Sequence, residues 1–196
     1  KNIIIVENTR DCLGKIAKYK RNLYDIPVIA VTGSVGKTST KDIIANVVAQ
    51  KYNVLKTEGN HNNDIGLPLT ILSLKDHNAL VIEMGMNHLR EIAYLTNIAK
   101  PQIAVITNVG TAHIGNLGSR ENILKAKLEI LEGLQENGTI IINNDNDLLA
   151  KWAKEDTKYN KITYGIEEKS DVMAYDIKIE ETYSKFFAAI NGEKYK

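Results

Sequence analysis

Several features are scarce in this sequence, and each absence excludes a class of protein. The 196 residues include a single cysteine, Cys12, so an internal disulfide and a cysteine-cluster metal site are excluded. Lys and Arg number 25 against 24 Asp and Glu, so no basic excess points to nucleic acid. No apolar run is long enough to span a membrane, and the opening residues 1–7 are too short for a signal-peptide core. We therefore expect a cytoplasmic protein that binds neither nucleic acid nor a membrane.

The segment 28–40 carries the strongest positive signal. Residues 28–31 read as a short buried strand, a turn bracketed by glycines follows, and residues 37–50 have the period of a helix. Glycine lets the main chain approach a ligand closely, and N–H groups at a helix start attract anions, so those of Ser34 to Lys37 are expected to face one. The Lys37 ammonium suits terminal phosphates, and the Thr38 hydroxyl suits Mg²⁺. We predict a nucleoside triphosphate site formed by Thr32, Gly33, Ser34, Val35, Gly36, Lys37, Thr38 and Ser39.

One position departs from the usual phosphate-loop spacing, because Val31 stands where a glycine is expected. An ordinary strand-to-helix turn is therefore an alternative interpretation. The combination of Gly36, Lys37 and Thr38 after an aliphatic strand favours phosphate binding. The helix that follows is expected to bury an apolar face made of Ile43, Ile44, Val47 and Val48.

Strands and helices alternate along the chain up to residue 154. Further strands are expected at 52–56, 79–83, 103–107 and 139–142, with helices at 89–99, 120–134 and 146–154. Several of these strands are apolar on both faces, which is typical of a parallel sheet covered on both sides. From about Lys161 an alternating pattern instead predicts a small antiparallel appendage. The predicted fold class is thus α/β, a phosphate-loop protein with a mostly parallel sheet and a β appendage at its end.

The first 25 residues read as a separate unit. Residues 2–6 suggest a strand, and Asn8 or Thr9 is placed to cap a helix. That helix is expected to turn Arg21 outward and to bury its apolar side chains Leu13, Ile16, Ala17 and Leu23. We expect residues 1–25 to end an upstream domain and residues 26–196 to form the nucleotide-binding domain.

Other polar residues fall at the carboxyl ends of predicted strands, where open parallel sheets bind ligands. Glu83 has the placement of an acidic Mg²⁺ ligand, with a solvated strand-end carboxylate as the alternative. His113 lies in the next such loop, although a lone loop histidine is more often a surface residue. Asn60, Asn62 and Asn63 suit phosphate or a polar substrate, or an ordinary turn. These residues indicate a Mg-nucleotide enzyme or switch without naming a second substrate.

Five strings in order resemble the central ATP-binding domain of the Mur ligase family. The resemblance is dense over residues 26–155, and five ordered motifs are far more specific than any one of them. In that family the phosphate loop reads Thr-Gly-Ser-x-Gly-Lys-Thr, which accommodates Val31. The strings are TGSVGKT at 32–38, GNHNNDIGLP at 59–68, IEMGMNH at 82–88, AHIGNLGS at 112–119 and KAKLEI at 125–130.

The resemblance implies an ATP-dependent, ADP-forming ligase that works through an acyl phosphate. The string at 59–68 favours the members that add D-alanyl-D-alanine to UDP-N-acetylmuramoyl-tripeptide in peptidoglycan synthesis, acting as a monomer. Another Mur-type or folylpolyglutamate-type ligase is an alternative, as is a non-catalytic nucleotide-binding module. A P-loop kinase ranks last, because the four arginines are not clustered as in a phosphate-binding lid.

The resemblance also assigns roles by motif. It implies that Lys37 contacts the β- and γ-phosphates, that Thr38 and Glu83 bind one Mg²⁺, and that His113 binds a second. Family members often carry a carbamylated lysine in the following helix, and Lys127 occupies that place, with unmodified Lys127 on a solvated face as the alternative. Substrate would lie beside Asn60, Asn62 and Asn63, and adenosine beside the loop that contains Asn143 and Asp145.

Members of this family have three domains. We expect this chain to be mainly the middle one, with only the end of the N-terminal substrate domain and without the C-terminal domain. On that basis the chain alone is expected to bind Mg-ATP weakly and not to turn over.

Overall fold

The computed structural model describes residues 3–190 and 193–195, and a single nine-stranded sheet organises them. The strand order is β2-β3-β1-β4-β5-β6-β7-β8-β9. Neighbours from β2 to β7 pair in parallel, whereas β7, β8 and β9 pair antiparallel. The strands are β1 (Val28–Thr32), β2 (Val54–Lys56), β3 (Ala79–Glu83), β4 (Ile103–Ile106), β5 (Thr139–Asn143), β6 (Asn160–Gly165), β7 (Val172–Ile179), β8 (Ser184–Ile190) and β9 (Glu193–Tyr195).

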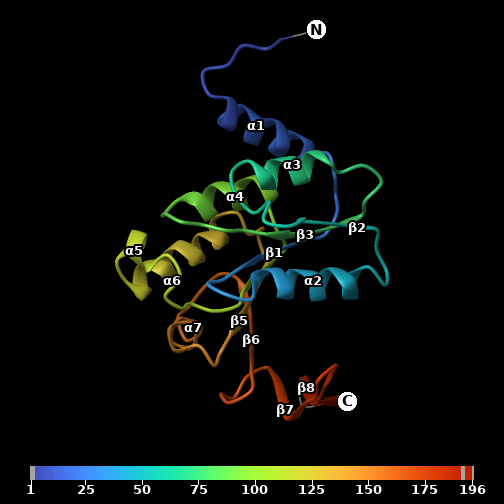
Figure 1. Cartoon of the computed structure of the whole chain (residues 1–196), viewed down its shortest axis with the longest axis vertical. Coiled ribbons are helices and arrows are strands. Elements are labelled where there is room, and N and C mark those ends of the chain that lie inside the picture. The colour runs from blue at the N-terminus through green and yellow to red at the C-terminus, as the bar shows by residue number, and fades with distance from the viewer. Residues whose placement is uncertain (1–2, 191–192, 196) are drawn as a thin grey trace.

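Helices cover both faces of the parallel part of the sheet. In Figure 1, α2 lies on one side of β1 and β3, and α3 and α4 lie on the other, with α1 as an outer layer on α3 and α4. Within the described residues, no helix has the length and apolar character needed to cross a bilayer. The helices are α1 (Thr9–Asn22), α2 (Lys37–Val48), α3 (Gly66–Leu72), α4 (Glu91–Ala99), α5 (Ile114–Leu117), α6 (Arg120–Leu128), the 3₁₀ helix η1 (Glu129–Glu132) and α7 (Asp147–Ala153).

The central strands form the core, as their continuous apolar runs predict. Every residue of β3 is buried, and β1 and β4 are almost as fully enclosed. Aliphatic side chains on both faces of a strand can be buried only when helices cover both sides, and this arrangement is present. The predicted α/β fold is confirmed, and β3 ends at Glu83 as expected.

The buried face of α2 differs from the one predicted. Ile43 and Val47 are 65% and 67% exposed, while Lys41 and Ala45 are buried. The helix starts directly at the phosphate loop, so its rotation is set by the loop and not by its most apolar stripe. Lys41 consequently faces the sheet edge, where its Nζ donates to the Thr57 carbonyl at 2.7 Å.

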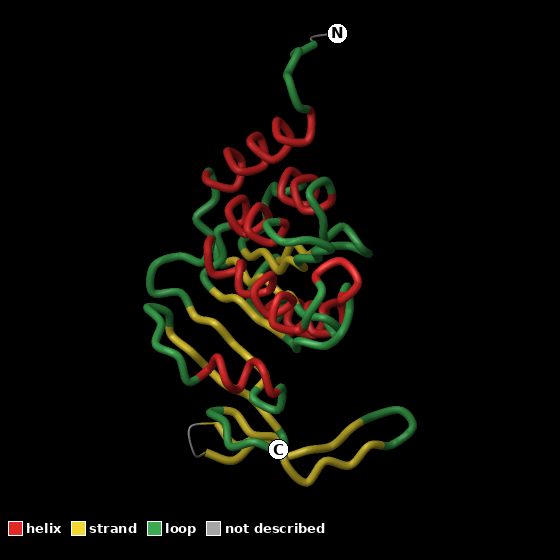
Figure 2. Tube along the Cα trace, turned by 90° about the vertical axis from the view of Figure 1, so that its left-hand side faces the viewer, coloured by secondary structure: helices red, strands yellow, loops and turns green. Residues whose placement is uncertain are grey.

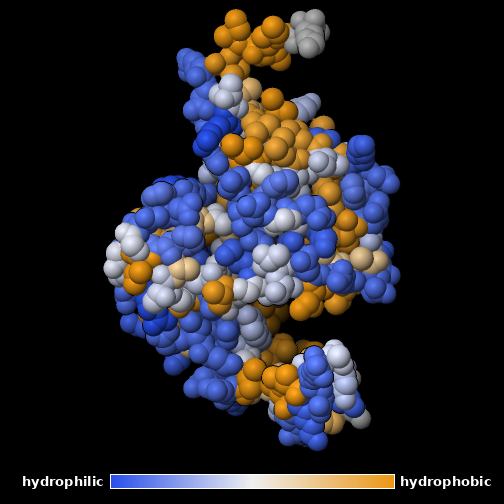
Figure 3. All heavy atoms as spheres, in the orientation of Figure 1, coloured by the Kyte–Doolittle hydropathy of each residue, from blue (hydrophilic) through white to orange (hydrophobic). Residues whose placement is uncertain are grey.

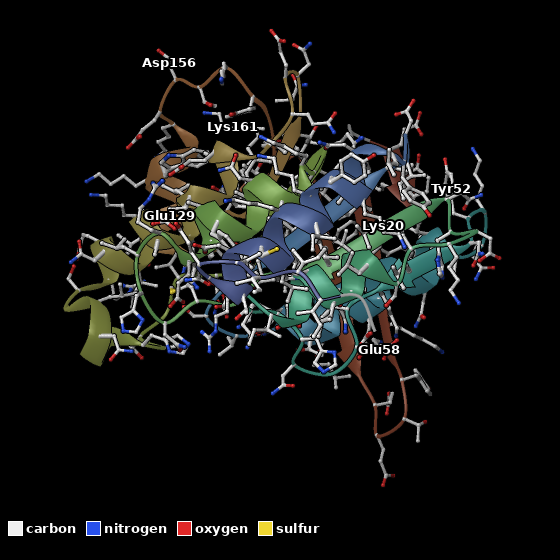
Figure 4. All side chains as sticks on the ribbon, turned by 90° about the horizontal axis from the view of Figure 1, so that it is seen from above. Lys20, Tyr52, Glu58, Glu129, Asp156 and Lys161 are labelled. Atoms are coloured by element: carbon white, nitrogen blue, oxygen red, sulfur yellow. The ribbon has the colours of Figure 1, made fainter. Side chains whose placement is uncertain are left out.

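The N-terminal segment is also corrected in detail. Asn8 caps α1 as predicted, but residues 3–6 do not form a strand, and residue 2 lies outside the described part. Arg21 does not point outward: it is buried and donates to the carbonyls of Ala99, Tyr24 and Ile26. Lys20, labelled on α1 in Figure 4, donates to the Leu72 carbonyl at 2.7 Å. α1 is therefore anchored on the core through its cations, with Ile16 and Leu23 left exposed.

The antiparallel part begins later than predicted. β6 pairs in parallel with β5, so the appendage consists of β7 to β9, and residues 191–192 lie outside the described part of the chain. Figure 2 shows the β7–β8 hairpin extending away from the rest of the sheet. Tyr175 and Phe187 stack across it with ring centroids 5.7 Å apart. Apolar atoms of these strands border a hollow beneath the body in Figure 3.

Candidate active site

The phosphate loop joins β1 to α2 through two glycines with positive φ. Gly33 has φ 154°, and a Cβ there would lie 1.8 Å from the Thr107 hydroxyl oxygen. Gly36 has φ 80° and is the N-cap of α2. Only glycine adopts this left-handed conformation without a steric cost, so both positions need it. The Lys37 side chain folds back over the loop, and its Nζ donates to the Gly33 carbonyl at 3.0 Å.

The loop after β4 holds the phosphate loop in place. The Asn108 side-chain oxygen accepts from the N–H groups of Ser34 and Val35 at 3.0 and 2.9 Å. Thr107 donates its hydroxyl to the Val35 carbonyl, and the Gly110 N–H donates to the Ser34 hydroxyl. The prediction that the Ser34 and Val35 N–H groups face an anion is therefore wrong, because Asn108 takes them. The first N–H groups of α2 have no acceptor within the helix and are the ones left for phosphate.

Glu83 lies against α2 at the end of β3. Its side chain is 2% exposed, and its Oε2 accepts from the Thr38 hydroxyl at 2.9 Å. Its Oε1 accepts from the side-chain amide of Asn62 at 2.7 Å, and its N–H donates to the Thr57 hydroxyl. The two residues predicted to share one Mg²⁺ are thus in direct contact.

A cleft of about 220 Å³ brings most of the predicted residues together. Four segments far apart in sequence supply its walls: the phosphate loop, the asparagine-rich loop, the loop after β3, and the α5–α6 region. It is lined by Gly33, Lys37, Asn60, Asn62, Asn63, Gly85, Met86, Asn87, Glu91, His113 and Lys127. The order of residues in the sequence does not show that Lys127 lies near the phosphate loop. In the structure, Lys127 lines the same cleft as Gly33 and Lys37.

Lys127 is the most perturbed group in the cleft. The residue is 2% exposed, and it lines the cleft together with Lys37 and His113. Burial, with a smaller contribution from the nearby Lys37 ammonium, lowers the pKa of Lys127 from 10.5 to about 7. The interpretation of Lys127 as part of a solvated face is therefore wrong, because the residue is 2% exposed.

His113 occupies a strained main-chain position at the edge of the cleft. It is the N-cap of α5 and has φ 66°, which non-glycine residues rarely adopt. Such conformations gather at functional sites, where the surrounding structure holds them. The residue is exposed, and it lines the cleft together with Lys37 and Lys127.

Other predicted residues have structural contacts outside the cleft. Thr32 is fully buried and donates to the Met84 carbonyl. Asn143 donates to the Thr107 carbonyl, and so lies at the same sheet edge as the phosphate loop. Asp145 accepts from the N–H groups of residues 166 to 168; burial raises the pKa of Asp145, but these hydrogen bonds outweigh it and lower the pKa overall.

Two supporting residues were missed by sequence reasoning. Asn108 is one, and Glu129, labelled in Figure 4, is the other. The buried Glu129 carboxylate accepts from the N–H groups of Arg90 and Ala93 at 2.7 and 3.2 Å, which fixes the start of α4 beside Lys127. Both pairings join residues more than 35 positions apart, so no local pattern could reveal them.

The residues present suit a magnesium ion that is shared with phosphate. Mg²⁺ prefers oxygen ligands and usually takes one or two from protein, the rest from phosphates and water. Thr38 and Glu83 supply such oxygens beside the phosphate loop. In the described part of the chain, no group of three or more His, Cys, Asp or Glu is placed to hold a metal ion.

A known protein family matches most of this chain. The model of the Mur ligase middle domain matches residues 31–196. The chain belongs to the Mur ligase family. A UDP-N-acetylmuramoyl-tripeptide–D-alanyl-D-alanine ligase from a Synechocystis strain is 49% identical over 164 residues, which is 83% of this chain and 36% of the relative.

Solved structures of Mur ligases share the fold over nearly the whole chain. MurF from Acinetobacter baumannii superposes with a TM-score of 0.92 at 34% identity, over 98% of this chain and 42% of that one. MurF from Thermotoga maritima in complex with ADP gives 0.90 at 34% identity, over 100% of this chain and 46% of that one. This Mur ligase chain therefore spans less than half the length of these relatives.

Proposed function

We propose that this chain is the ATP-binding part of a ligase that joins D-alanyl-D-alanine to UDP-N-acetylmuramoyl-tripeptide in peptidoglycan precursor synthesis. The observation that carries the proposal is the cleft, in which Lys37, His113 and Lys127 converge on the phosphate loop. The names of the relatives supply the two substrates. A relative from Thermotoga maritima was solved in complex with ADP, which supports nucleotide binding, and the phosphate loop is the place where this chain would hold the phosphates.

The reaction consists of two displacements. A carboxylate oxygen of the tripeptide attacks the γ-phosphorus, the bond from that phosphorus to the β–γ bridging oxygen breaks, and ADP leaves. The amine of D-alanyl-D-alanine then attacks the acyl carbon, phosphate leaves, and the amine loses a proton. Both reactants of the first step are anions, so cationic groups and helix N–H donors must offset their repulsion.

Each residue has a part in this scheme. The Lys37 ammonium and the first N–H groups of α2 hold the β- and γ-phosphates. Thr38 and Glu83 would hold one Mg²⁺, and His113 and a carbamylated Lys127 a second; these ions would neutralise charge on the phosphates and the acyl oxygen. Asn60, which lines the cleft, would contact the γ-phosphate and the acceptor, and the sheet edge at Asn143 would contact the adenosine, with Asp145 shaping that loop.

The burial of Lys127 supports its carbamylation. An amine with a pKa of about 7 is partly neutral at physiological pH, and only the neutral amine attacks CO₂. The new N–C bond converts a cation into an anionic oxygen ligand and releases a proton. The same burial would also retain the carbamate, because little water reaches it.

An acceptor assay on the longer protein, of which we propose this chain is the central part, tests the proposal. Phosphate release should require both the tripeptide nucleotide and D-alanyl-D-alanine, and single amino acids such as glutamate should not replace the dipeptide. Release with glutamate instead would favour a folylpolyglutamate-type ligase, and nucleotide binding without release would favour a non-catalytic module. The 196-residue chain alone should bind nucleotide without forming product.

A further inference from the structure

The three asparagines of the cleft wall are used differently by the fold. Asn63 orders the turn that leads into α3, because its side-chain oxygen accepts from the N–H groups of Ile65 and Gly66 at 3.1 and 2.8 Å. The neighbouring Asp64 carboxylate pairs with Arg10 at 3.1 Å. Asn60 lines the cleft, and within the described residues its side chain has no hydrogen-bond partner in the protein. Of the three asparagines, Asn62 is the one whose side chain bonds to Glu83.

We infer that Asn62 is a positioning residue that holds the Glu83 carboxylate in the orientation needed for Mg²⁺. The inference rests on the Mg²⁺ role proposed above for Thr38 and Glu83. Asn62 donates to Oε1 of Glu83 at 2.7 Å, which leaves Oε2 turned toward the Thr38 hydroxyl at 2.9 Å. The carboxylate is therefore clamped from both sides, with the oxygen on the α2 side directed at the phosphate loop.

The main chain around Asn62 is built to keep this contact. The Gly85 N–H donates to the Asn62 carbonyl at 2.8 Å, so Asn62 is docked on the end of β3 through main chain as well as side chain. A Cβ at position 85 would lie 2.8 Å from Oδ1 of Asn62, so Gly85 leaves the space that the side chain occupies. Asn62 thus reaches Glu83 only because its neighbour has no side chain.

The far end of the same loop is fastened to Glu83 too. Thr57 accepts the Glu83 N–H on its hydroxyl, and the buried Lys41 donates to the Thr57 carbonyl. The loop from residue 57 to 62 therefore contacts both the main chain and the carboxylate of Glu83. Partners that orient a ligand in this way tune metal binding, and their loss typically weakens it by about ten- to a hundredfold.

A magnesium titration of nucleotide binding by the full chain tests the inference without relying on ligation. The probes are a fluorescent ADP analogue and MgCl₂, and the readouts are the analogue's Kd in EDTA, the Mg²⁺ concentration at half-maximal enhancement, and the melting temperature. Asn62→Ala should raise the Mg²⁺ midpoint about tenfold and leave the Kd in EDTA unchanged. Gly85→Ala should do the same, because the added methyl displaces the Asn62 side chain.

Asn63→Ala is the matched control from the same loop. It should lower the melting temperature through loss of the two hydrogen bonds to Ile65 and Gly66, and leave the Mg²⁺ midpoint in place. An Asn62→Ala midpoint equal to that of the unmodified chain would overturn the inference; if that variant does not fold, Gly85→Ala decides by the same criterion. If Mg²⁺ does not strengthen binding of the ADP analogue to the unmodified chain, the proposed Mg²⁺ role of Thr38 and Glu83 is wrong. The inference about Asn62 is then wrong as well, because it rests on that role.

Discussion

Replacing Lys127 by methionine should stabilise the chain in a pH-dependent manner. Methionine has a similar length and no charge, so Lys127→Met removes the cost of burying an amine that is 2% exposed. The pKa of that amine falls from 10.5 to about 7 on folding. Between these values the unfolded chain binds more protons than the folded one, so the stability of the unmodified chain rises with pH across this window.

The size of the effect follows from the same shift. Each pKa unit corresponds to about 1.4 kcal/mol, so the full cost below pH 7 is about 5 kcal/mol. At pH 7.5 the variant should exceed the unmodified chain by up to about 4 kcal/mol, and at pH 9.5 by about 1.5 kcal/mol. The difference should therefore shrink by more than half over two pH units.

Urea denaturation from pH 7.5 to 9.5 in bicarbonate-free buffer measures this difference. Lys125→Met is the matched control, because Lys125 lies on the same helix and is exposed, and its stability curve should run parallel to that of the unmodified chain. Parallel curves for Lys127→Met as well would refute the claim that Lys127 is buried with a depressed pKa. Added bicarbonate should stabilise the unmodified chain and not the variant.

Three further predictions concern binding and folding. Lys37→Met should weaken nucleotide binding about ten- to a hundredfold, the value of a charge-assisted phosphate contact, as measured by calorimetry. Gly133→Ala should destabilise the chain by about 1–3 kcal/mol, because its methyl would lie 2.2 Å from the Thr96 carbonyl oxygen, whereas Gly115→Ala meets open space and should be nearly neutral in thermal denaturation. Asp145→Ala should lower the melting temperature at pH 7, and its difference from the unmodified chain should narrow as pH falls below 3.8, because the lowered pKa of Asp145 contributes stability only while the carboxylate is ionised.

The parts of the fold that sequence predicts well are those fixed by local composition. The strand, turn and helix around the phosphate loop follow from an apolar run and from two turn positions whose main-chain conformation favours glycine. The end of β3 at Glu83 follows from the apolar run before it. The parallel order of the central strands follows in turn from their double-sided apolarity.

The errors arise where a distant partner decides which way a side chain faces. Arg21 carries a charge yet is buried, because its guanidinium donates to the carbonyl of Ala99, which is 78 positions away, as well as to those of Tyr24 and Ile26 just after α1. The N–H groups of Ser34 and Val35 meet Asn108, more than 70 residues away. Asn62 and Asn63 are adjacent in sequence, yet the fold gives their side chains different partners, Glu83 for one and the N–H groups of Ile65 and Gly66 for the other.

The bonds from residues 107 to 110 to the phosphate loop have a consequence for how nucleotide is captured. Because these bonds form during folding, the loop is ordered before a ligand arrives, and the entropy of fixing it is lost in folding and not in association. Nucleotide should therefore meet a rigid receptor, with association limited by encounter and not by loop rearrangement. Substitutions at residues 107–110 that remove these bonds should then lower both the association rate and the affinity for nucleotide, although none of those residues lines the cleft.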